Sequence, residues 1–365
     1  MKIIGPIAGI GSRLRPFTLS KPKAFINVAG KTVLEHILDK FSKTFDSKTE
    51  LILVVGYKKK QIMNFVKEKY HNKFKLTFIE QIPRGYQDDI PYYWGLGEAI
   101  YLTHTRFEKK DFESKDKDKR NGSMIFLADM IPMVDYSYLM YRYYESDVDG
   151  IITVMEVPKE NANSYGIVSI DENSNIIQLI EKPKEFISNL AIAGIYAFSN
   201  SITQALFSKI KKYLDKRTDD SKEIYLTESL QDLVNDGHKI AAVNLKEDIL
   251  DFGRPSALLN GNQYLLKQDS IKKEDFTELK ISSEKSFIKN PVYIGSNTKI
   301  INSVLGPYVS IGNNSILKNC ILEDCVIEHN VVLNNIISRR SIIGSNVKVE
   351  DISKDNIIIG DKSIF

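Results

Sequence analysis

The 365-residue chain has few of the residues that build stapled domains and metal centres. It contains only two cysteines, Cys320 and Cys325, which lie five positions apart within an apolar repeat. Such sparse usage excludes a disulfide framework, so we expect two small buried thiols in a reducing compartment. The five histidines are scattered along the chain and show no metal-ligand spacing, which argues against a zinc site.

The chain also lacks a large net charge and long apolar runs. Its 50 basic side chains oppose 47 acidic ones, for a formal net charge of +3. This balance argues against nucleic acid as a partner, and the lysine-rich tracts at 58–60 and 115–120 are typical of solvated loops. No apolar run approaches the length that spans a bilayer, and no signal peptide is visible. We therefore expect a cytoplasmic protein with no membrane partner.

Residues 1–265 alternate between apolar runs of strand length and helix-like patterns. This alternation predicts an α/β domain with a mainly parallel, mixed, Rossmann-like sheet that carries helices on both faces. Ligands of such sheets bind at the carboxyl ends of the strands. Strands are expected at 2–4, 51–56, 76–79, 124–127 and 150–154, and helices at 32–41, 60–70 and 96–105.

The composition and the apolar pattern of the sequence change after residue 265. Residues 266–285 are charged and poor in core residues, which predicts a linker. Across 286–365 apolar residues recur every six positions, a period typical of a parallel β-helix built from hexapeptide rungs. Exposed end rungs need capping or a partner subunit, so we expect a homo-oligomer. The repeating apolar positions include Leu305, Ile311, Leu317, Val331, Ile337, Ile343 and Val349.

A glycine turn with basic neighbours follows the first predicted strand. Gly9 and Gly11 would let backbone N–H groups approach a phosphate. Arg13 and Lys23 add two cations near this turn, and Lys21 adds a third. Fixed amides with nearby cations suit a triphosphate. A Gly-x-Gly turn taken alone is equally an ordinary strand-to-helix connection.

Motifs along the whole chain occur in the order and approximate spacing of a known family. They are Gly9 to Pro16 with Lys23, Gln81, Gly95 to Ile100, Leu127 to Asp129, Tyr165–Gly166, Glu181 to Pro183, Ala193 to Tyr196, Asp251 to Gly253, and Gly306 to Gly312. On these motifs the chain resembles the sugar nucleotidylyltransferases, and in particular the long form of glucose-1-phosphate thymidylyltransferase. The resemblance implies a GT-A-like nucleotidyltransferase domain at 1–265 and a left-handed parallel β-helix at 286–365.

The resemblance also implies a reaction and a set of site residues. A nucleoside monophosphate would pass from dTTP or UTP to a hexose 1-phosphate, with glucose 1-phosphate as the first choice, and pyrophosphate would leave. Mg²⁺ would be held by Asp129 and Asp251. The catalytic set would be Arg13, Lys23, Asp129, Lys182 and Asp251. Nucleotide contacts would come from Ala8, Gly9, Gly11, Ser12, Gln81 and Gly95, and sugar-phosphate contacts from Tyr165, Gly166, Glu181, Lys182 and Gly194.

Each of these residues has a plainer interpretation. An Asp after a buried strand is often a turn or helix-cap residue, and Asp-x-Gly triplets are common turns. The segment 181–183 could be a surface turn, and Gln81 could lie at an exposed strand end. The chain also departs from the family at Ile7, where a small Ala is usual, at Ala128, where Gly is usual, and by an aromatic insertion at 84–94. The charged loop at 108–121 has no assigned role.

Three alternatives to the leading function remain open. The enzyme could use another base and sugar, to make GDP-mannose or UDP-N-acetylglucosamine. It could carry a second, acyltransferase activity in the β-helix, for which His329 is the candidate residue. It could also be a non-catalytic regulatory relative, although such proteins tend to lose the cations and acids that this chain retains.

Overall fold

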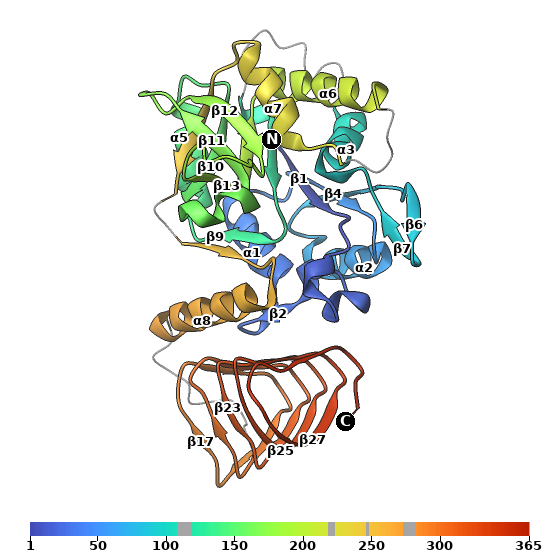
Figure 1. The fold of residues 1–365 in the computed structure, drawn as a ribbon, viewed down its shortest axis with the longest axis vertical. Coiled ribbons are helices and arrows are strands. Elements are labelled where there is room, and N and C mark those ends of the chain that lie inside the picture. The colour runs from blue at the N-terminus through green and yellow to red at the C-terminus, as the bar shows by residue number, and fades with distance from the viewer. Residues whose placement is uncertain (108–118, 218–222, 246–247, 273–281, 365) are drawn as a thin grey trace. The chain divides into compact units, whose positions relative to one another are not determined.

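The structure is a computed structural model that describes residues 1–107, 119–217, 223–245, 248–272 and 282–364. The chain divides into two compact units (Figure 1). The sheet unit comprises Met1–Ile10 and Ile37–Ile249, and the β-helix unit comprises Gly11–His36 and Leu250–Phe365. The basic loop after the first strand therefore belongs to the same unit as the β-helix, which differs from the expected boundary at residue 265.

The sheet unit is built on a mixed sheet, as the sequence predicts. Its parallel part has the order β8-β1-β4-β5, and antiparallel pairing of β8 with β13 extends it towards β11 and β12. Strand β10 pairs with β13 and with β14. The strands are β1 (Lys2–Ile7), β4 (Glu50–Val55), β5 (Lys75–Glu80), β8 (Ser123–Phe126), β10 (Gly150–Glu156), β11 (Gly166–Ile170), β12 (Ile176–Glu181), β13 (Leu190–Phe198) and β14 (Ile240–Asn244).

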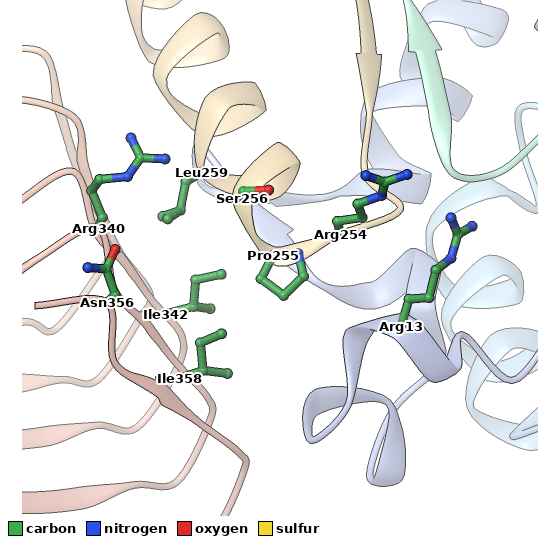
Figure 2. A pocket seen from close by; sticks show the side chains of 9 residues that line it. All are labelled: Arg13, Arg254, Pro255, Ser256, Leu259, Arg340, Ile342, Asn356 and Ile358. Carbon is green, nitrogen blue, oxygen red and sulfur yellow. The ribbon is translucent and has the colours of Figure 1, made fainter. Parts of the chain in front are cut away.

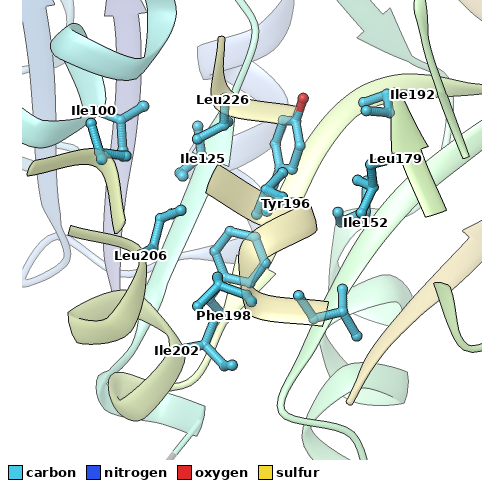
Figure 3. Close-up of a cluster of buried hydrophobic side chains, with 14 of the residues drawn as sticks. Ile100, Ile125, Ile152, Leu179, Ile192, Tyr196, Phe198, Ile202, Leu206 and Leu226 are labelled. Atoms are coloured by element: carbon cyan, nitrogen blue, oxygen red, sulfur yellow. The ribbon is translucent and has the colours of Figure 1, made fainter. Parts of the chain in front are cut away.

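Helices cover both faces of this sheet. Ile125 of β8 joins a buried cluster with α3, α6 and α7, which Figure 3 shows. The next residue, Phe126, points to the opposite face, where its ring meets Phe41 of α1 edge-on at 5.0 Å. The helices are α1 (Val33–Thr44), α2 (Lys59–Tyr70), α3 (Gly95–Leu102), α5 (Tyr136–Glu145), α6 (Asn200–Asp215) and α7 (Leu226–Asn235). All the expected strands and helices are therefore confirmed, within a few residues at their ends.

Short strands and 3-10 turns also occur in the connecting loops of the chain. The insertion at 84–94 forms a hairpin whose two turn residues, Asp88 and Asp89, both have positive φ, as a type I′ turn requires. The short strands are β2 (Asn27–Val28), β3 (Lys31–Thr32), β6 (Gly85–Gln87), β7 (Ile90–Tyr92), β9 (Met130–Pro132) and β15 (Ile249–Asp251). Most of the charged loop at 108–121 lies outside the described residues.

The C-terminal region is a parallel β-helix, consistent with the left-handed form. Strands on one side pair in register at steps of 16 or 17 residues, for example Phe287 with Val304, Val304 with Ile321, and Ile321 with Ile337. The strands are β16 (Ser282–Glu284), β17 (Phe287–Ile288), β18 (Val292–Ile294), β19 (Lys299–Ile301), β20 (Val304–Leu305), β21 (Val309–Ile311), β22 (Ile316–Lys318), β23 (Ile321–Glu323), β24 (Val326–Ile327), β25 (Val332–Arg339), β26 (Ile342–Ile343), β27 (Lys348–Ser353) and β28 (Ile358–Ile359).

Asparagines turn the corners of the β-helix. Asn302, Asn319 and Asn335 adopt positive φ, and each amide donates to the side chain of the next rung at 2.7–2.8 Å. The residue after each corner points inward, so Ile336 is buried and Ile337 is 48% exposed. Ile337, although part of the six-residue pattern, therefore lies on the outside of the β-helix. The thiols of Cys320 and Cys325 are buried and free of disulfides, as expected.

The predicted linker is in part helix. Helix α8 (Pro255–Lys272) extends past residue 265 because Leu265 and Leu266 are buried, so the segment 266–272 is not a linker. Residues 273–281 of the predicted linker lie outside the described part of the chain, and β16 starts before residue 286. Within the described residues, no helix is both long and apolar enough to cross a bilayer.

Candidate active site

In the sheet unit, Asp129 lies in a turn that begins at the carboxyl end of strand β8. The turn packs against Gly194, whose carbonyl accepts the Leu127 N–H at 2.9 Å. Gly194 has a φ of +86°, and a Cβ built on it would lie 3.2 Å from the Met130 Cβ. Glycine is therefore required at 194 both by its backbone conformation and by the closeness of the turn that carries the Asp129 carboxylate.

Apart from Gly194, the predicted sugar-phosphate residues gather at one edge of the same unit. Gly166 of β11 pairs with Glu181 of β12, and the Lys182 N–H donates to the Tyr165 carbonyl at 2.9 Å. Lys182 has a φ of +44°, a left-handed conformation that costs a non-glycine residue about 1 kcal/mol or more. Such strain is found at functional sites. Here it places the Lys182 ammonium 3.7 Å from a Glu181 carboxylate oxygen, with the lysine side chain about half exposed.

Buried Tyr196 connects this edge to the Asp129 turn. Burial raises the pKa of the Tyr196 phenol, and the negative charges of Glu181 and Asp129 raise it further. Both carboxylates therefore lie near enough to the phenol to raise its pKa, and the phenol stays protonated at neutral pH. The sequence grouped Glu181 and Asp129 only through the family pattern, and it did not single out Tyr196 as a buried phenol near both of them.

Two further residues at this edge were not predicted. The Thr227 hydroxyl donates to a Glu181 carboxylate oxygen at 3.3 Å, and the Lys182 ammonium lies 5.7 Å from the centre of the Tyr225 ring. Both come from the start of helix α7, more than 40 positions from Glu181. No local pattern in the sequence points to them, because their role depends on how α7 packs on β12.

Two of the predicted nucleotide-binding residues, Ala8 and Gln81, directly follow the ends of β1 and β5. The Ala8 carbonyl accepts the Tyr57 N–H at 3.1 Å, and Ala8 is buried whereas Gly9 is exposed. Gln81 is also buried, and its amide nitrogen donates to the Gly95 carbonyl at 3.1 Å and to Glu98 at 2.7 Å. The plainer interpretation of Gln81 as an exposed strand end is therefore wrong. Its donors are used inside the protein, which leaves its carbonyl oxygen as the group that could accept from a base.

The hairpin of the insertion is anchored beside this region. Arg84 forms an ion pair with the buried carboxylate of Glu98, and its guanidinium lies 3.8 Å from the centre of the Trp94 ring. Tyr93 packs on Gly56 so closely that a Cβ there would lie 2.9 Å from the tyrosine hydroxyl and 2.9 Å from the Ala8 Cβ. Burial raises the pKa of Tyr93 to about 12, with smaller contributions from Tyr86, Glu80 and Tyr57. The insertion thus contributes a neutral phenol next to Ala8.

The β-helix unit carries the other predicted residues. Gly11 has a φ of +65°, and a Cβ there would lie 2.9 Å from the Lys23 Cβ, so the loop folds back to bring Lys23 to the glycine turn. Ser12 and Arg13 are exposed on the 3-10 turn that follows. The Asp251 carboxylate accepts the Gly253 N–H at 2.7 Å, and a Cβ on Gly253 would lie 3.6 Å from an Arg13 guanidinium nitrogen. Arg13 and the 251–253 turn are therefore neighbours.

Arg254 adds a cation that sequence reasoning missed. It lines, together with Arg13, a cavity of about 550 Å³ in the β-helix unit (Figure 2). Both guanidinium groups are exposed, and Arg340 at the far side of the cavity pairs with Asp324 at 2.9 Å. The signal for Arg254 was its position directly after the Asp-Phe-Gly motif.

Lys21 does not join the other loop cations as predicted. Its ammonium is turned towards the β-helix, where it pairs with Glu328 and lies 3.1 Å from Asp361. The lysine side chain is only 11% exposed. Because Lys21 is buried between two carboxylates, its charge is neutralised within the protein. Of the three loop cations named from the sequence, Arg13 and Lys23 are therefore the candidates for binding a triphosphate.

His329 occupies a repeated corner of the β-helix. Its Nδ1 atom accepts the Asn313 N–H at 2.9 Å. Asn313 does the same for the Ser296 N–H, and Asp361 for the Ser345 N–H, each at 2.9 Å. The imidazole therefore acts as a rung-corner acceptor equivalent to an Asn or Asp side chain.

Each unit contains one of the two carboxylates that were predicted to bind a metal ion, Asp129 in the sheet unit and Asp251 in the β-helix unit. Among the described residues, no group of three or more His, Cys, Asp or Glu side chains is arranged to hold a metal. Asp129 and Asp251 each lie at the end of a strand, and carboxylate oxygens are the ligands that a hard divalent cation prefers. The donor chemistry of these two residues therefore fits Mg²⁺, with substrate oxygens and water as further ligands.

Comparison with protein families gives one match across most of the chain. Residues 7–268 match the family described as nucleotidyl transferase. Among curated proteins, the bifunctional protein GlmU of Methanocaldococcus jannaschii is 33% identical over 259 residues, 71% of this chain and 53% of that protein. The chain thus spans about half the length of such relatives. The UTP–glucose-1-phosphate uridylyltransferase AglF of Haloferax volcanii is 28% identical over 255 residues, 70% of this chain and 92% of AglF.

Solved structures show the same fold. A UDP-glucose pyrophosphorylase complexed with UDP-glucose matches with a TM-score of 0.56 at 18% identity, over 73% of this chain and 98% of the other. The corresponding enzyme from Acinetobacter baumanii matches with a TM-score of 0.52 at 21% identity, over 74% and 98%. At these identities the likeness establishes the fold and leaves the substrates open.

Proposed function

Because the chain belongs to the nucleotidyl transferase family, we propose that it makes a nucleotide sugar from a nucleoside triphosphate and a sugar 1-phosphate. The preferred pair is UTP or dTTP with a hexose 1-phosphate, with glucose 1-phosphate as the first candidate. The observation that carries the proposal is that the Asp129 and Glu181 carboxylates both act on the buried Tyr196 phenol, while Lys182 lies beside Glu181 and the Asp129 turn packs against Gly194. In this proposal a carboxylate for a metal and a cation for a phosphate would act near a carboxylate suited to sugar hydroxyls.

The proposed reaction is an in-line displacement at the α-phosphorus. An oxygen of the sugar 1-phosphate forms the new bond to that phosphorus, and the bond from phosphorus to the pyrophosphate oxygen breaks. The attacking phosphate is already anionic near neutral pH, so no general base is required. Catalysis then depends on positioning two polyanions and on stabilising the charge of the transition state.

Different charged side chains would bind the sugar phosphate, the triphosphate and the metal ion. Lys182 would hold the sugar phosphate, and Glu181, fixed by the Thr227 hydroxyl, would accept sugar hydroxyls. Arg13, Lys23 and the backbone amides near Gly11 would bind the triphosphate, and Arg254 adds a further cation. Asp129 and Asp251 would hold Mg²⁺, which when bound neutralises phosphate charge and polarises the α-phosphate.

The base preference rests on the environment of Gln81. With both amide donors committed, its carbonyl oxygen can accept an N–H but the side chain cannot donate to a base. Uracil and thymine offer such an N–H at position 3. The relatives named for UTP and UDP-glucose chemistry favour the same choice. GDP-mannose and UDP-N-acetylglucosamine synthesis remain alternatives, the latter because of the GlmU relatives.

The other two alternatives have less support. An acyltransferase in the β-helix would require His329 as a base, and its Nδ1 atom is used in a rung corner. A non-catalytic regulatory protein would not be expected to retain the five residues Arg13, Lys23, Asp129, Lys182 and Asp251.

One assay tests the proposed function. The full chain is incubated with Mg²⁺, each of five nucleoside triphosphates and the 1-phosphates of glucose, mannose, galactose and N-acetylglucosamine, and pyrophosphate release is measured. We expect the highest kcat/KM with UTP or dTTP and glucose 1-phosphate. Lys182→Gln should raise the KM for the sugar phosphate at least tenfold, whereas Lys184→Gln, two positions away and exposed, should not. Absence of pyrophosphate release from every pair would exclude the proposal.

A further inference from the structure

Lys21 is a buried cation without a role in the proposed chemistry. Its ammonium donates to a Glu328 carboxylate oxygen and lies 3.1 Å from an Asp361 oxygen. The side chains of Glu328 and Asp361 are only 1% and 9% exposed. Burial lowers the pKa of Lys21, and the Asp361 carboxylate opposes that shift. The Lys21 ammonium is therefore shielded from solvent and held by two carboxylates of the β-helix.

Further contacts join the same two carboxylates to the loop. The Asn27 N–H donates to the second Glu328 oxygen at 3.2 Å, and the Ser20 hydroxyl donates to Asp361. On the β-helix side, Ser345 donates its hydroxyl to Glu328 at 2.7 Å and its N–H to Asp361 at 2.9 Å. The two carboxylates thus receive donors from both the loop and the β-helix.

The loop is also held by packing and by α8. Pro16 lies against the backbone at Gly360, where an added Cβ would come within 2.8 Å of the proline ring. At the other end of the loop, the Ala29 N–H donates to Asn262 of α8 at 2.9 Å, and the Ser310 hydroxyl of the β-helix donates to the same Asn262 oxygen at 2.8 Å. The segment between these anchors carries Lys23, and Arg13 precedes Pro16 by three positions.

We propose that the β-helix contributes to triphosphate binding by positioning the basic loop. Glu328 and Asp361 bind Lys21 and so hold in place the loop that presents Arg13 and Lys23 to the triphosphate. Lys21, Glu328 and Asp361 are positioning residues, since they act through the loop rather than on the substrate. The inference rests on the proposed function in one respect, which is the assignment of Arg13 and Lys23 to the triphosphate.

A purely structural ion pair would give a different pattern of effects. Removing one partner of a buried pair destabilises the fold, whatever the loop does. A positioning role adds a selective effect, because the sugar-phosphate residues Glu181 and Lys182 belong to the other unit. Loosening the loop should therefore weaken triphosphate binding and leave the KM for the sugar phosphate nearly unchanged.

Glu328→Gln in the full chain tests the proposal. The amide keeps an acceptor for the Asn27 N–H and leaves the Lys21–Asp361 pair in place, so the variant removes one charge with little change of shape. Glu323→Gln is the matched control, because Glu323 lies on the same β-helix, is about half exposed and pairs only loosely with Arg339 at 3.4 Å. Asp361→Asn is the second variant in case Glu328→Gln does not fold. Lys21→Arg is compared with Lys21→Gln as a conservative rescue.

Calorimetric binding of UTP and dTTP, steady-state kinetics and melting temperature are measured for each variant. We expect Glu328→Gln to raise the dissociation constant and KM for the triphosphate at least tenfold, with less than a threefold change in the KM for the sugar phosphate. Glu323→Gln should match the wild type, and Lys21→Arg should bind nucleotide better than Lys21→Gln. A lowered melting temperature with unchanged triphosphate binding and KM, in both Glu328→Gln and Asp361→Asn, would overturn the inference. An inactive wild type that still binds triphosphate would contradict the proposed function instead.

Discussion

The close approach of Gly194 to the Asp129 turn leads to a prediction with a matched control. Gly194 and Gly237 have nearly the same backbone conformation, with φ of +86° and +87°. Substitution of either by Ala forces an L-residue into the left-handed region, which costs about 1–2 kcal/mol. A Cβ on Gly237 meets nothing within 4 Å, whereas a Cβ on Gly194 lies 3.2 Å from the Met130 Cβ and 3.4 Å from the Leu127 Cβ. The two variants therefore share the backbone strain and differ in crowding.

The crowding at Gly194 determines how much the two variants should differ in stability and in kcat. Overpacking of this kind typically costs a further 1–3 kcal/mol or is relieved by a shift of the neighbour. Because the neighbour is the turn that carries Asp129, a shift of a few tenths of an ångström would misplace the carboxylate that we propose binds the metal. A misplacement of 1 Å can cost roughly 100-fold in rate, so we expect kcat to fall on the order of tenfold for Gly194→Ala. Gly237→Ala should keep the wild-type kcat.

Thermal melting and steady-state pyrophosphate release measure the two effects separately. Gly194→Ala should melt below Gly237→Ala, and both should melt below the wild type. If the two variants had equal kcat and equal melting temperatures, the argument that Gly194 supports the Asp129 turn would be refuted. If Gly194→Ala were less stable but fully active, the contact would be structural only.

Three other predictions follow from charges and burial. Asp129→Asn should lower kcat at least about 100-fold with an unchanged melting temperature, because the amide cannot hold a divalent cation as the carboxylate does; near-normal turnover would remove Asp129 from the site. Glu98→Ala should lower the free energy of unfolding by about 3 kcal/mol, because it removes the acceptor of Arg84 and one of the two acceptors of Gln81. The exposed Glu68→Ala should change the free energy of unfolding by less than about 0.5 kcal/mol in denaturant titrations. Burial raises the pKa of the Cys325 thiol to about 12 from 9.0, so at pH 8.5 iodoacetamide should not label the folded protein, and rapid labelling would contradict the burial. Above about pH 9 the thiol ionises in the unfolded chain but not in the folded one. This residue therefore lowers the free energy of unfolding as the pH rises towards 12.

The strands of the sheet and the rungs of the β-helix could be read from the sequence because burial leaves a local pattern. Strand β4 is buried at every position, and an unbroken apolar run records this. The six-residue period likewise follows from the geometry of the rungs. Ile337 departs from the pattern because the coils are 16 or 17 residues long rather than 18, so a six-residue period shifts in phase from coil to coil. The sequence predicts a linker at the end of helix α8 because its last turns are polar and charged, although Leu265 and Leu266 are buried.

The arrangement of the site was less visible in the sequence. Glycine turns and single acids were identified by motif, but the partners that hold them come from distant segments. Thr227 and Tyr225 reach Glu181 and Lys182 only because α7 packs on β12. The role of Lys21 depends on Glu328, 307 positions away, and a lysine in a basic loop carries no sign that its charge is used elsewhere.

The spacing of the two carboxylates that hold Lys21 limits how the β-helix can change in length. Glu328 follows β24 and Asp361 follows β28, and β24 pairs with β26, which pairs with β28. The gain or loss of one coil between them would move Asp361 along the solenoid axis by about 4.8 Å, the spacing of neighbouring strands, and out of reach of the ammonium. Coils before β24 are free of this constraint. Relatives that keep the lysine and both acids should therefore vary in coil number upstream of β24 and keep the last coils at constant length.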